Sequence, residues 1–77
     1  MNELLINIDK IHTTSLGINR IKENLGINED VVLYCKKLIL DKKCKINKKG
    51  KNYYCEIYNT IITVNSYSFT IITAHKL

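Results

Sequence analysis

The spacing of apolar and polar positions along this 77-residue chain changes near residue 44. Over residues 1–43, apolar side chains recur every three or four positions, as they do on one face of a helix. Over residues 44–77 they alternate with polar ones and are mostly β-branched or aromatic, which is typical of half-buried strands. The change predicts a single α+β domain in which a helical part precedes a β-meander.

Three helices are expected in the first part. The first runs from Asn2 to Ile11. The second begins at a cap formed by Thr13 or Thr14 and ends before Gly26, since glycine readily adopts the left-handed conformation that follows a helix. The third runs from a cap at Asn28 to Ile39.

Four short strands are expected in the second part, joined as an antiparallel meander by turns near Gly50 and Asn59 and by a longer loop. A register that pairs Cys44 with Cys55 and Val64 with Phe69 places the apolar residues of all four strands on one face. We expect the three helices to pack on that face alone. The expected strands are Cys44 to Asn47, Asn52 to Tyr58, Ile61 to Asn65 and Phe69 to His75.

Positive charge is concentrated in one segment. The chain has 12 Lys and Arg against 7 Asp and Glu, a formal charge of +5. Residues 36–51 hold eight lysines and one acid, a local charge of +7, so four cations and six acids leave −2 elsewhere. Such a local field favours RNA or another polyanion as partner, although a solvated lysine surface is an alternative. The candidate nucleic-acid-binding residues are Lys42, Lys43, Lys45, Lys48, Lys49 and Lys51.

Other features narrow the class of protein. No stretch approaches the ~20 apolar residues of a membrane span. The acid Glu3 argues against a signal or transit peptide. Three cysteines without C-x-x-C spacing favour free thiols over a disulfide framework or a zinc site. We expect a cytoplasmic protein without membrane partner, metal or cofactor, in which Cys44 and Cys55 are contacting core thiols.

The motifs of most enzyme classes are missing, including phosphate-binding glycine loops and G-x-S-x-G. The remaining side chains suit metal-independent cleavage of RNA, in which a base takes the 2′-OH proton and an acid protonates the leaving 5′-oxygen. Strict alternation along the last strand would place Thr73 and His75 on the helix-facing side, near the second helix. The candidates are His12 and His75 as base and acid, Arg20 as phosphate ligand, and Tyr58, Thr70 and Thr73 as auxiliary groups.

Two longer strings carry a resemblance, IHTTSLGINRIKENLGI and CKINKKGKNYYCEIYNTIITVNSYSFTIITAHKL. They resemble a family of short bacterial and mobile-element proteins catalogued as a domain of unknown function. More distantly, the layout resembles the toxin ribonucleases of the barnase, EndoU, colicin and RelE fold group. Their pattern of a His, a helix bearing Arg or Lys, and a final T-x-x-T-A-x strand maps onto His12, Arg20 and Thr70 to His75. This resemblance implies a toxin or defence-related endoribonuclease.

Two other interpretations fit the same residues. The alternative interpretation is a non-catalytic basic module of phage or plasmid origin, which binds nucleic acid or inhibits a host nucleic-acid-binding enzyme. The chain is also readable as a subunit that needs a protein partner, such as an antitoxin or a host target. In that case Tyr54, Tyr58 and Tyr67 would be the interface anchors.

Overall fold

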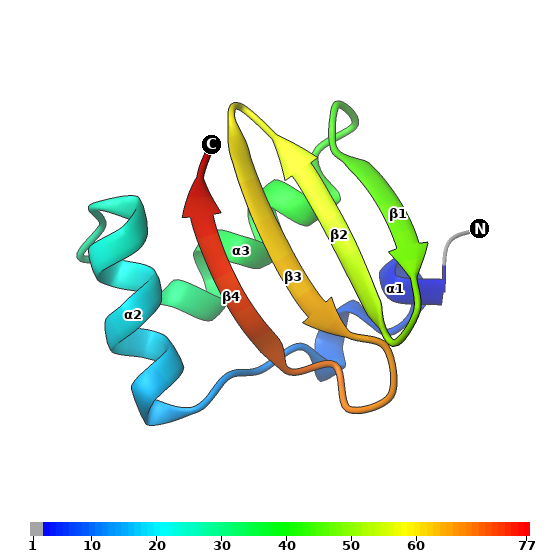
Figure 1. Ribbon diagram of the computed structural model, residues 1–77, viewed down its shortest axis with the longest axis horizontal. Helices are drawn as coiled ribbons and strands as arrows, with labels where there is room; N and C mark the ends of the chain where they lie inside the picture. Colours follow the sequence, from blue (N-terminus) through cyan, green and yellow to red (C-terminus); the bar gives the residue numbers. More distant parts are fainter. Residues whose placement is uncertain (1–2) are drawn as a thin grey trace.

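The computed structural model describes residues 3–77, which form one antiparallel sheet with strand order β1-β2-β3-β4 and the helices before it. The predicted α+β class and the four-stranded meander are confirmed. The elements are α1 (Glu3–Ile6), the 3-10 turn η1 (Ile8–Lys10), α2 (Ser15–Leu25), α3 (Val31–Leu40), β1 (Lys45–Lys49), β2 (Asn52–Ile57), β3 (Thr60–Asn65) and β4 (Ile71–Lys76) (Figure 1).

The predicted first helix is interrupted at Asn7. Its expected start at Asn2 lies outside the described residues, and the helical part ends at Ile6. The side-chain amide of Asn7 donates to the Glu3 carbonyl at 2.9 Å, and its backbone N–H is shared between the carbonyls of Glu3 and Leu4. An asparagine that bonds its own backbone in this way competes with helix continuation, so a 3-10 turn follows.

The ends of α2 agree with the prediction from the sequence, whereas the start of α3 differs from it. Thr14 caps α2 by accepting the Gly17 N–H at 3.0 Å, and Gly26 follows α2 with φ 66°. The cap of α3 is Asp30 rather than Asn28, because the Asp30 carboxylate accepts the Leu33 N–H at 3.0 Å. A carboxylate at this position also interacts favourably with the helix dipole.

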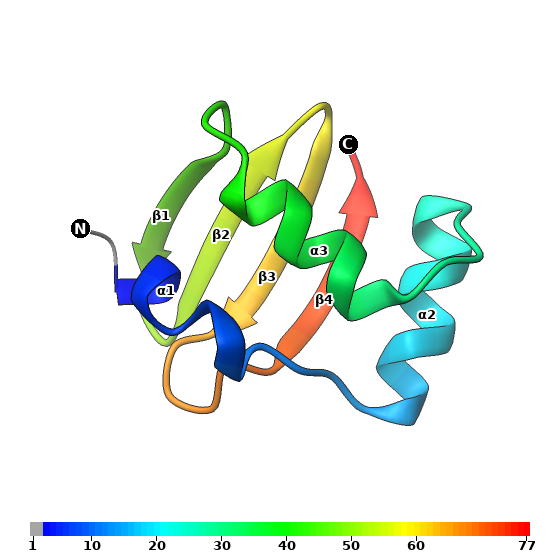
Figure 2. The ribbon, with the colours of Figure 1, turned by 180° about the vertical axis from the view of Figure 1, so that it is seen from behind.

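The three helices do not share one face of the sheet. Seen from behind, α3 crosses one face and α1 lies over the same face near β1, whereas α2 stands beside β4 (Figure 2). The structure does not confirm the prediction that all three helices pack on one face, because α2 lies beside the edge strand β4. The largest fully buried side chains join α1, α2 and α3 to the covered face: Leu4, Ile21, Cys35, Ile39, Cys55, Ile62, Val64 and Ile71.

The outer edge of β4 is closed by α2 and the segment before it. The backbone of His12 pairs with the start of β4 in an isolated parallel bridge. The Thr13 hydroxyl donates to the Ile71 carbonyl at 3.0 Å, and the Asn24 amide donates to the Ala74 carbonyl at 3.3 Å. Since edge strands are prone to pair with other chains, these bonds protect β4. They leave β1 at the opposite edge of the sheet.

The register of the first three strands differs from the prediction by two residues. Cys55 pairs with Ile46 and Ile62, rather than with Cys44 and Val64. A shift of two returns every side chain to the same face, so the predicted faces of β2 and β3 are correct. Tyr53, Cys55, Ile57, Ile62 and Val64 are all buried as expected.

The turns account for this shift. The β1–β2 turn occupies Gly50 and Lys51, with φ 62° at Gly50, and the β2–β3 turn occupies Tyr58 and Asn59, with φ 49° and 57°. Each turn lies one residue from its predicted position. Moving a two-residue turn by one position changes the register by two, which is why the error does not alter the faces.

β4 contains a bulge that strict alternation did not predict. Val64 pairs with Ile71 and Thr63 pairs with Thr73, so Ile72 is an extra residue on β4. The predicted pairing of Val64 with Phe69 is wrong, because Phe69 lies in the loop before β4 with φ 59°.

The bulge reverses the faces of the residues that follow it. Ala74, opposite Ile62, is fully buried, whereas His75, opposite Ile61, is exposed on the other face. Thr73 precedes His75 in the same new phase and pairs with Thr63. The prediction that Thr73 and His75 face the helices is therefore wrong, since one inserted residue changes the phase of every later position.

Deletion of Ile72 should remove the bulge and keep the faces of β4. Without the extra residue, Ile71 and Thr73 become neighbours opposite Val64 and Thr63, so Ala74 stays buried and His75 stays exposed. The deleted side chain is 49% exposed, so we expect a loss of about 1 kcal/mol in urea unfolding. Ala74→Leu overpacks a fully buried position and should cost more, about 3 kcal/mol. A larger loss from the deletion than from Ala74→Leu would contradict this account of β4.

Candidate functional site

The six lysines proposed from the sequence lie together at one side of the molecule. They occupy the turn after α3, the strand β1 and the turn between β1 and β2, and all six are exposed. β1 is an outermost strand of the sheet, so these side chains surround an edge that pairs with β2 on one side only. We call this set the β1 edge: Lys42, Lys43, Lys45, Lys48, Lys49 and Lys51.

The only acid within residues 36–51 does not neutralise the β1 edge. Asp41 Oδ1 accepts the backbone N–H of Lys43 at 2.8 Å, and Oδ2 accepts the Tyr58 hydroxyl at 3.1 Å. The hydrogen bond to Asp41 raises the pKa of Tyr58. Within residues 3–77, none of the six ammonium groups forms an ion pair, so their positive charge is accessible to solvent and ligands.

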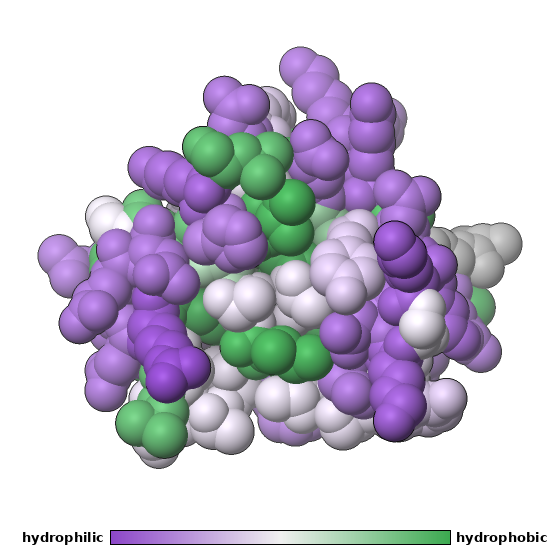
Figure 3. All heavy atoms as spheres, in the orientation of Figure 1, coloured by the Kyte–Doolittle hydropathy of each residue, from purple (hydrophilic) through white to green (hydrophobic). Residues whose placement is uncertain are grey.

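The face of the sheet that α1 and α3 do not cover adjoins the β1 edge, and we call it the open face. Side chains of intermediate or high hydropathy lie along its middle, while hydrophilic side chains gather over β1 (Figure 3). The ring of Tyr54, which is 37% exposed, lies opposite Asn47 of β1. The register arranges this face in three rows: Lys45, Glu56, Ile61 and His75; Asn47, Tyr54, Thr63 and Thr73; and Lys49, Asn52 and Asn65.

His12 is held by hydrogen bonds on both ring nitrogens. Nδ1 lies 2.8 Å from the Lys10 carbonyl, and Nε2 lies 3.0 Å from Thr70 Oγ1. A carbonyl can only accept, so Nδ1 carries a proton and donates it. Nε2 of the neutral ring then accepts from the Thr70 hydroxyl. The structure thus brings together two of the sequence-predicted residues, His12 and Thr70.

The chain of bonds continues into the β3–β4 loop. Thr70 Oγ1 lies 2.8 Å from Ser68 Oγ, and Asn65 Oδ1 accepts the backbone N–H groups of Tyr67 and Ser68 at 2.8 and 2.9 Å. A hydroxyl, an imidazole and a carbonyl in this order resemble an activated nucleophile. However, Thr70 is also bound by Ser68, and the bonds join the segment before α2 to this loop. Asn65 and Ser68 were not among the site residues predicted from the sequence, although an asparagine at the end of a strand is a known turn former.

His12 and His75 lie at opposite ends of β4. His12 pairs with Thr70, and four residues separate Thr70 from His75. Because Ile72 is bulged, the two lie four steps of the ladder apart, about 13 Å at roughly 3.3 Å per residue. A catalytic base and acid must both lie within hydrogen-bond reach of the same phosphodiester. The structure does not bring the two histidines together. Arg20, the third proposed catalytic residue, is exposed on α2.

The remaining auxiliary residues and tyrosine anchors are dispersed. Thr73 lies on the open face, and Tyr58 lies in the β2–β3 turn, where it bonds Asp41. Tyr67 lies in the β3–β4 loop, at the other end of β3 from Tyr58 (Figure 1). The three tyrosines expected to anchor a protein partner therefore do not form one patch. Tyr54 adjoins β1, Tyr58 lies near Lys43 through Asp41, and Tyr67 lies in the loop at the other end of β3.

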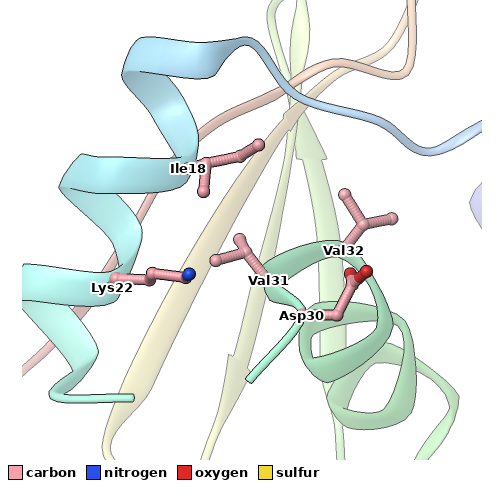
Figure 4. A pocket seen from close by; sticks show the side chains of 5 residues that line it. All are labelled: Ile18, Lys22, Asp30, Val31 and Val32. Carbon is pink, nitrogen blue, oxygen red and sulfur yellow. The ribbon is translucent and has the colours of Figure 1, made fainter. Parts of the chain in front are cut away.

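A hollow of about 290 Å³ opens between α2 and α3 (Figure 4). Its lining is largely aliphatic, and the carboxylate of Asp30 already caps α3. None of the sequence-predicted site residues reaches it, so the hollow adds nothing to the proposed chemistry. The residues that line it are Ile18 and Lys22 of α2 with Asp30, Val31 and Val32 at the start of α3.

The three cysteines are free thiols. Cys44 precedes β1 rather than pairing with Cys55 in the sheet, but the two side chains are hydrogen-bonded, so the predicted contact is present. Burial raises the pKa of Cys35 and of Cys55 to about 12. Among residues 3–77, no cluster of His, Cys, Asp and Glu side chains is suited to hold a metal ion. No helix in the same range has the length and apolar character needed to cross a bilayer.

Comparison with known proteins adds one finding. The family model described as "Protein of unknown function (DUF3781)" matches residues 5–75. No curated protein and no solved structure matches the chain. The resemblance to toxin ribonucleases is not tested by these comparisons and stays a prediction.

The two core thiols should make the protein sensitive to alkaline pH. The thiol pKa is 9.0 in its ordinary state and about 12 for Cys35 and Cys55 in the fold. Above pH 9.0 the unfolded chain therefore loses thiol protons that the folded chain retains, so stability falls as pH rises toward 12. We expect the thermal midpoint to drop across this range. In a Cys35→Ala/Cys55→Ala variant the drop should be smaller, and an unchanged pH profile would contradict the assignment.

Proposed function

This chain belongs to the DUF3781 family of proteins of unknown function, and we propose that it binds nucleic acid, single-stranded RNA in particular, through the β1 edge and the open face. The observation that carries the proposal is the excess of positive charge at the β1 edge. Six exposed lysines surround one strand, and the nearby carboxylate of Asp41 is occupied by other donors. Glu56, opposite Lys45, is the one acid on β1 and β2. Lysines that contact phosphates release condensed counterions, which is the main source of non-specific affinity for nucleic acids.

The direction of the side chains supports a ligand that lies across the sheet. Lys45 and Lys49 alternate with Ile46 and Lys48 along β1, so they project on the open face, about 13 Å apart for four residues of strand. Tyr54 lies one strand further in. A backbone along β1 would place bases over the middle row of the open face, which is neutral and offers the ring of Tyr54 for stacking. The acid Glu56 lies in the neighbouring row.

Single strands suit this surface better than a duplex does. The bases of single-stranded RNA can leave their stack and contact aromatic rings, whereas those of an RNA duplex are hidden in a deep, narrow groove. Stacking on one aromatic ring contributes about 1–3 kcal/mol per base and tolerates any sequence. We therefore propose binding with little sequence preference.

Binding is proposed here in place of cleavage for a geometric reason. The ribonuclease mechanism expected from the sequence needs His12 and His75 at one phosphodiester, and the two lie about 13 Å apart along β4. His12 is moreover tied to Lys10 and Thr70.

The lysines of the β1 edge also have a structural interpretation. Charged side chains, lysine above all, commonly protect an outermost strand from pairing with another sheet. The two roles can be distinguished experimentally, because lysines that protect the edge act without any ligand. Neutral variants should aggregate if the lysines only protect the edge, whereas they should stay monodisperse and lose RNA affinity if they bind phosphates.

Lys45→Gln/Lys49→Gln should weaken RNA binding in a salt-dependent manner. Each lost phosphate contact lowers the slope of log affinity against log salt by about 0.7 for single strands, so the double variant should lose about 1.4. The measurement is fluorescence anisotropy of a labelled single-stranded RNA of mixed sequence. Lys22→Gln/Lys76→Gln is the matched control, because it removes the same charge from α2 and from the end of β4. Equal slopes in both variants would show that only net charge matters.

RNA should stay intact during these measurements. Labelled RNA incubated with the protein is expected to show no new fragments on a denaturing gel, and His12→Ala should bind RNA as the unmodified protein does. Fragments ending in 2′,3′-cyclic phosphate, formed by the unmodified protein and lost in His12→Ala, would contradict the proposal and support the ribonuclease interpretation instead.

A further inference from the structure

The outer face of α3 carries an apolar stripe without a partner. Leu33 and Leu40 are 59% and 56% exposed, although each is large and aliphatic. They are seven residues apart, which is two helical turns, so they lie on the same side of α3. The buried side chains of α3 face the sheet, and this stripe therefore turns away from it (Figure 2). A shallow hollow of about 380 Å³ runs along the stripe, lined by Glu29, Asp30, Leu33, Lys36, Lys37 and Leu40.

Charge is distributed along this stripe in a regular order. Two acids lie at its beginning and two lysines lie further along. Glu29 and Asp30 come directly before α3, which begins at Val31, and Lys36 and Lys37 lie within it. All four line the hollow, so the stripe has an acidic end and a basic end.

We propose that this face binds a second copy of the same chain, with the two α3 helices antiparallel about a two-fold axis near Leu33. A two-fold axis of this kind reverses the direction of the helix. Glu29 and Asp30 of one copy then meet Lys36 and Lys37 of the other, and the two Leu33 side chains meet at the axis.

The positions match along the helix axis as well. Asp30, the cap of α3, lies three residues before Leu33, and Lys36 lies three residues after it, so each is about 4.5 Å from Leu33 along the axis at a rise of 1.5 Å per residue. The acidic end of one copy therefore reaches the lysines of the other. Asp30 uses Oδ1 to cap α3, which leaves Oδ2 for Lys37. A parallel arrangement would instead place lysine against lysine and acid against acid.

The complementary charges decide which partner fits this face. An apolar stripe alone would accept many partners, but isologous interfaces require a surface that is complementary to itself, as this one is. Exposed ion pairs add orientation and specificity more than affinity, so the leucines supply most of the attraction. We expect a dimer that dissociates on dilution.

Such a dimer would leave the proposed RNA surface free. α3 lies behind the sheet, and the open face points the opposite way (Figures 1 and 2). The two copies would therefore meet back to back, with a β1 edge and an open face available on each. A long RNA that reached both would bind more tightly than two separate sites do.

The test is sedimentation equilibrium over a range of protein concentrations at low ionic strength. The unmodified protein should show a monomer–dimer equilibrium. Glu29→Lys should be monomeric, because it places lysine against lysine, and Lys36→Glu should be monomeric, because it places acid against acid. An equimolar mixture of these two variants should form a heterodimer, since both pairs then again carry opposite charges.

Lys48→Glu is the matched control, because it reverses a charge on β1 without touching α3, and it should dimerise as the unmodified protein does. Circular dichroism of each variant verifies that it is folded. Three results would overturn the proposal: a monomer at every concentration of the unmodified protein, a dimer that Glu29→Lys leaves unchanged, or a mixture of the two variants that stays monomeric.

Discussion

The burial of one face of the sheet is the constraint on which the other features depend. α3 and α1 cover that face, and every second residue of β2 and β3 is therefore enclosed, all of them apolar except Thr60. The intervening residues are left on the open face, where Tyr54, Thr63 and Thr73 form a neutral row. β1 lies at the edge of the same sheet and contributes a single partly buried residue, Ile46, so three lysines and Asn47 occupy the rest of it without loss of core.

The sequence was sufficient for the faces of β2 and β3 but not for β4. Errors of one residue in the turns moved the register by two, which alternation tolerates. In β4 the bulge at Ile72 moved the phase by one, and local preference gave no warning because Ile71 and Ile72 are both β-branched and apolar. Tertiary context decides between them: Ala74 fits the enclosed space beside α2, whose Asn24 bonds its carbonyl.

In the candidate site, too, features set by local sequence were predicted and features set by tertiary context were not. The lysine cluster is continuous in the sequence, so charge alone located it. The pairing of two distant histidines depended on the face and end of β4 that each would occupy, and His75 was placed on the wrong face. The start of α3 was similarly ambiguous, since Asn28 and Asp30 are both good caps and the burial of Val31 favours the later start.

A titration of the isotope-labelled protein with a short single-stranded RNA, followed by amide chemical shifts, tests the central claim most directly. The account predicts that the largest changes fall on β1, on the turn that joins it to β2, and around Tyr54, while α2 and the outer face of α3 stay unchanged. Changes centred on α2 or on the outer face of α3, or none at protein concentrations where the RNA is bound, would contradict it.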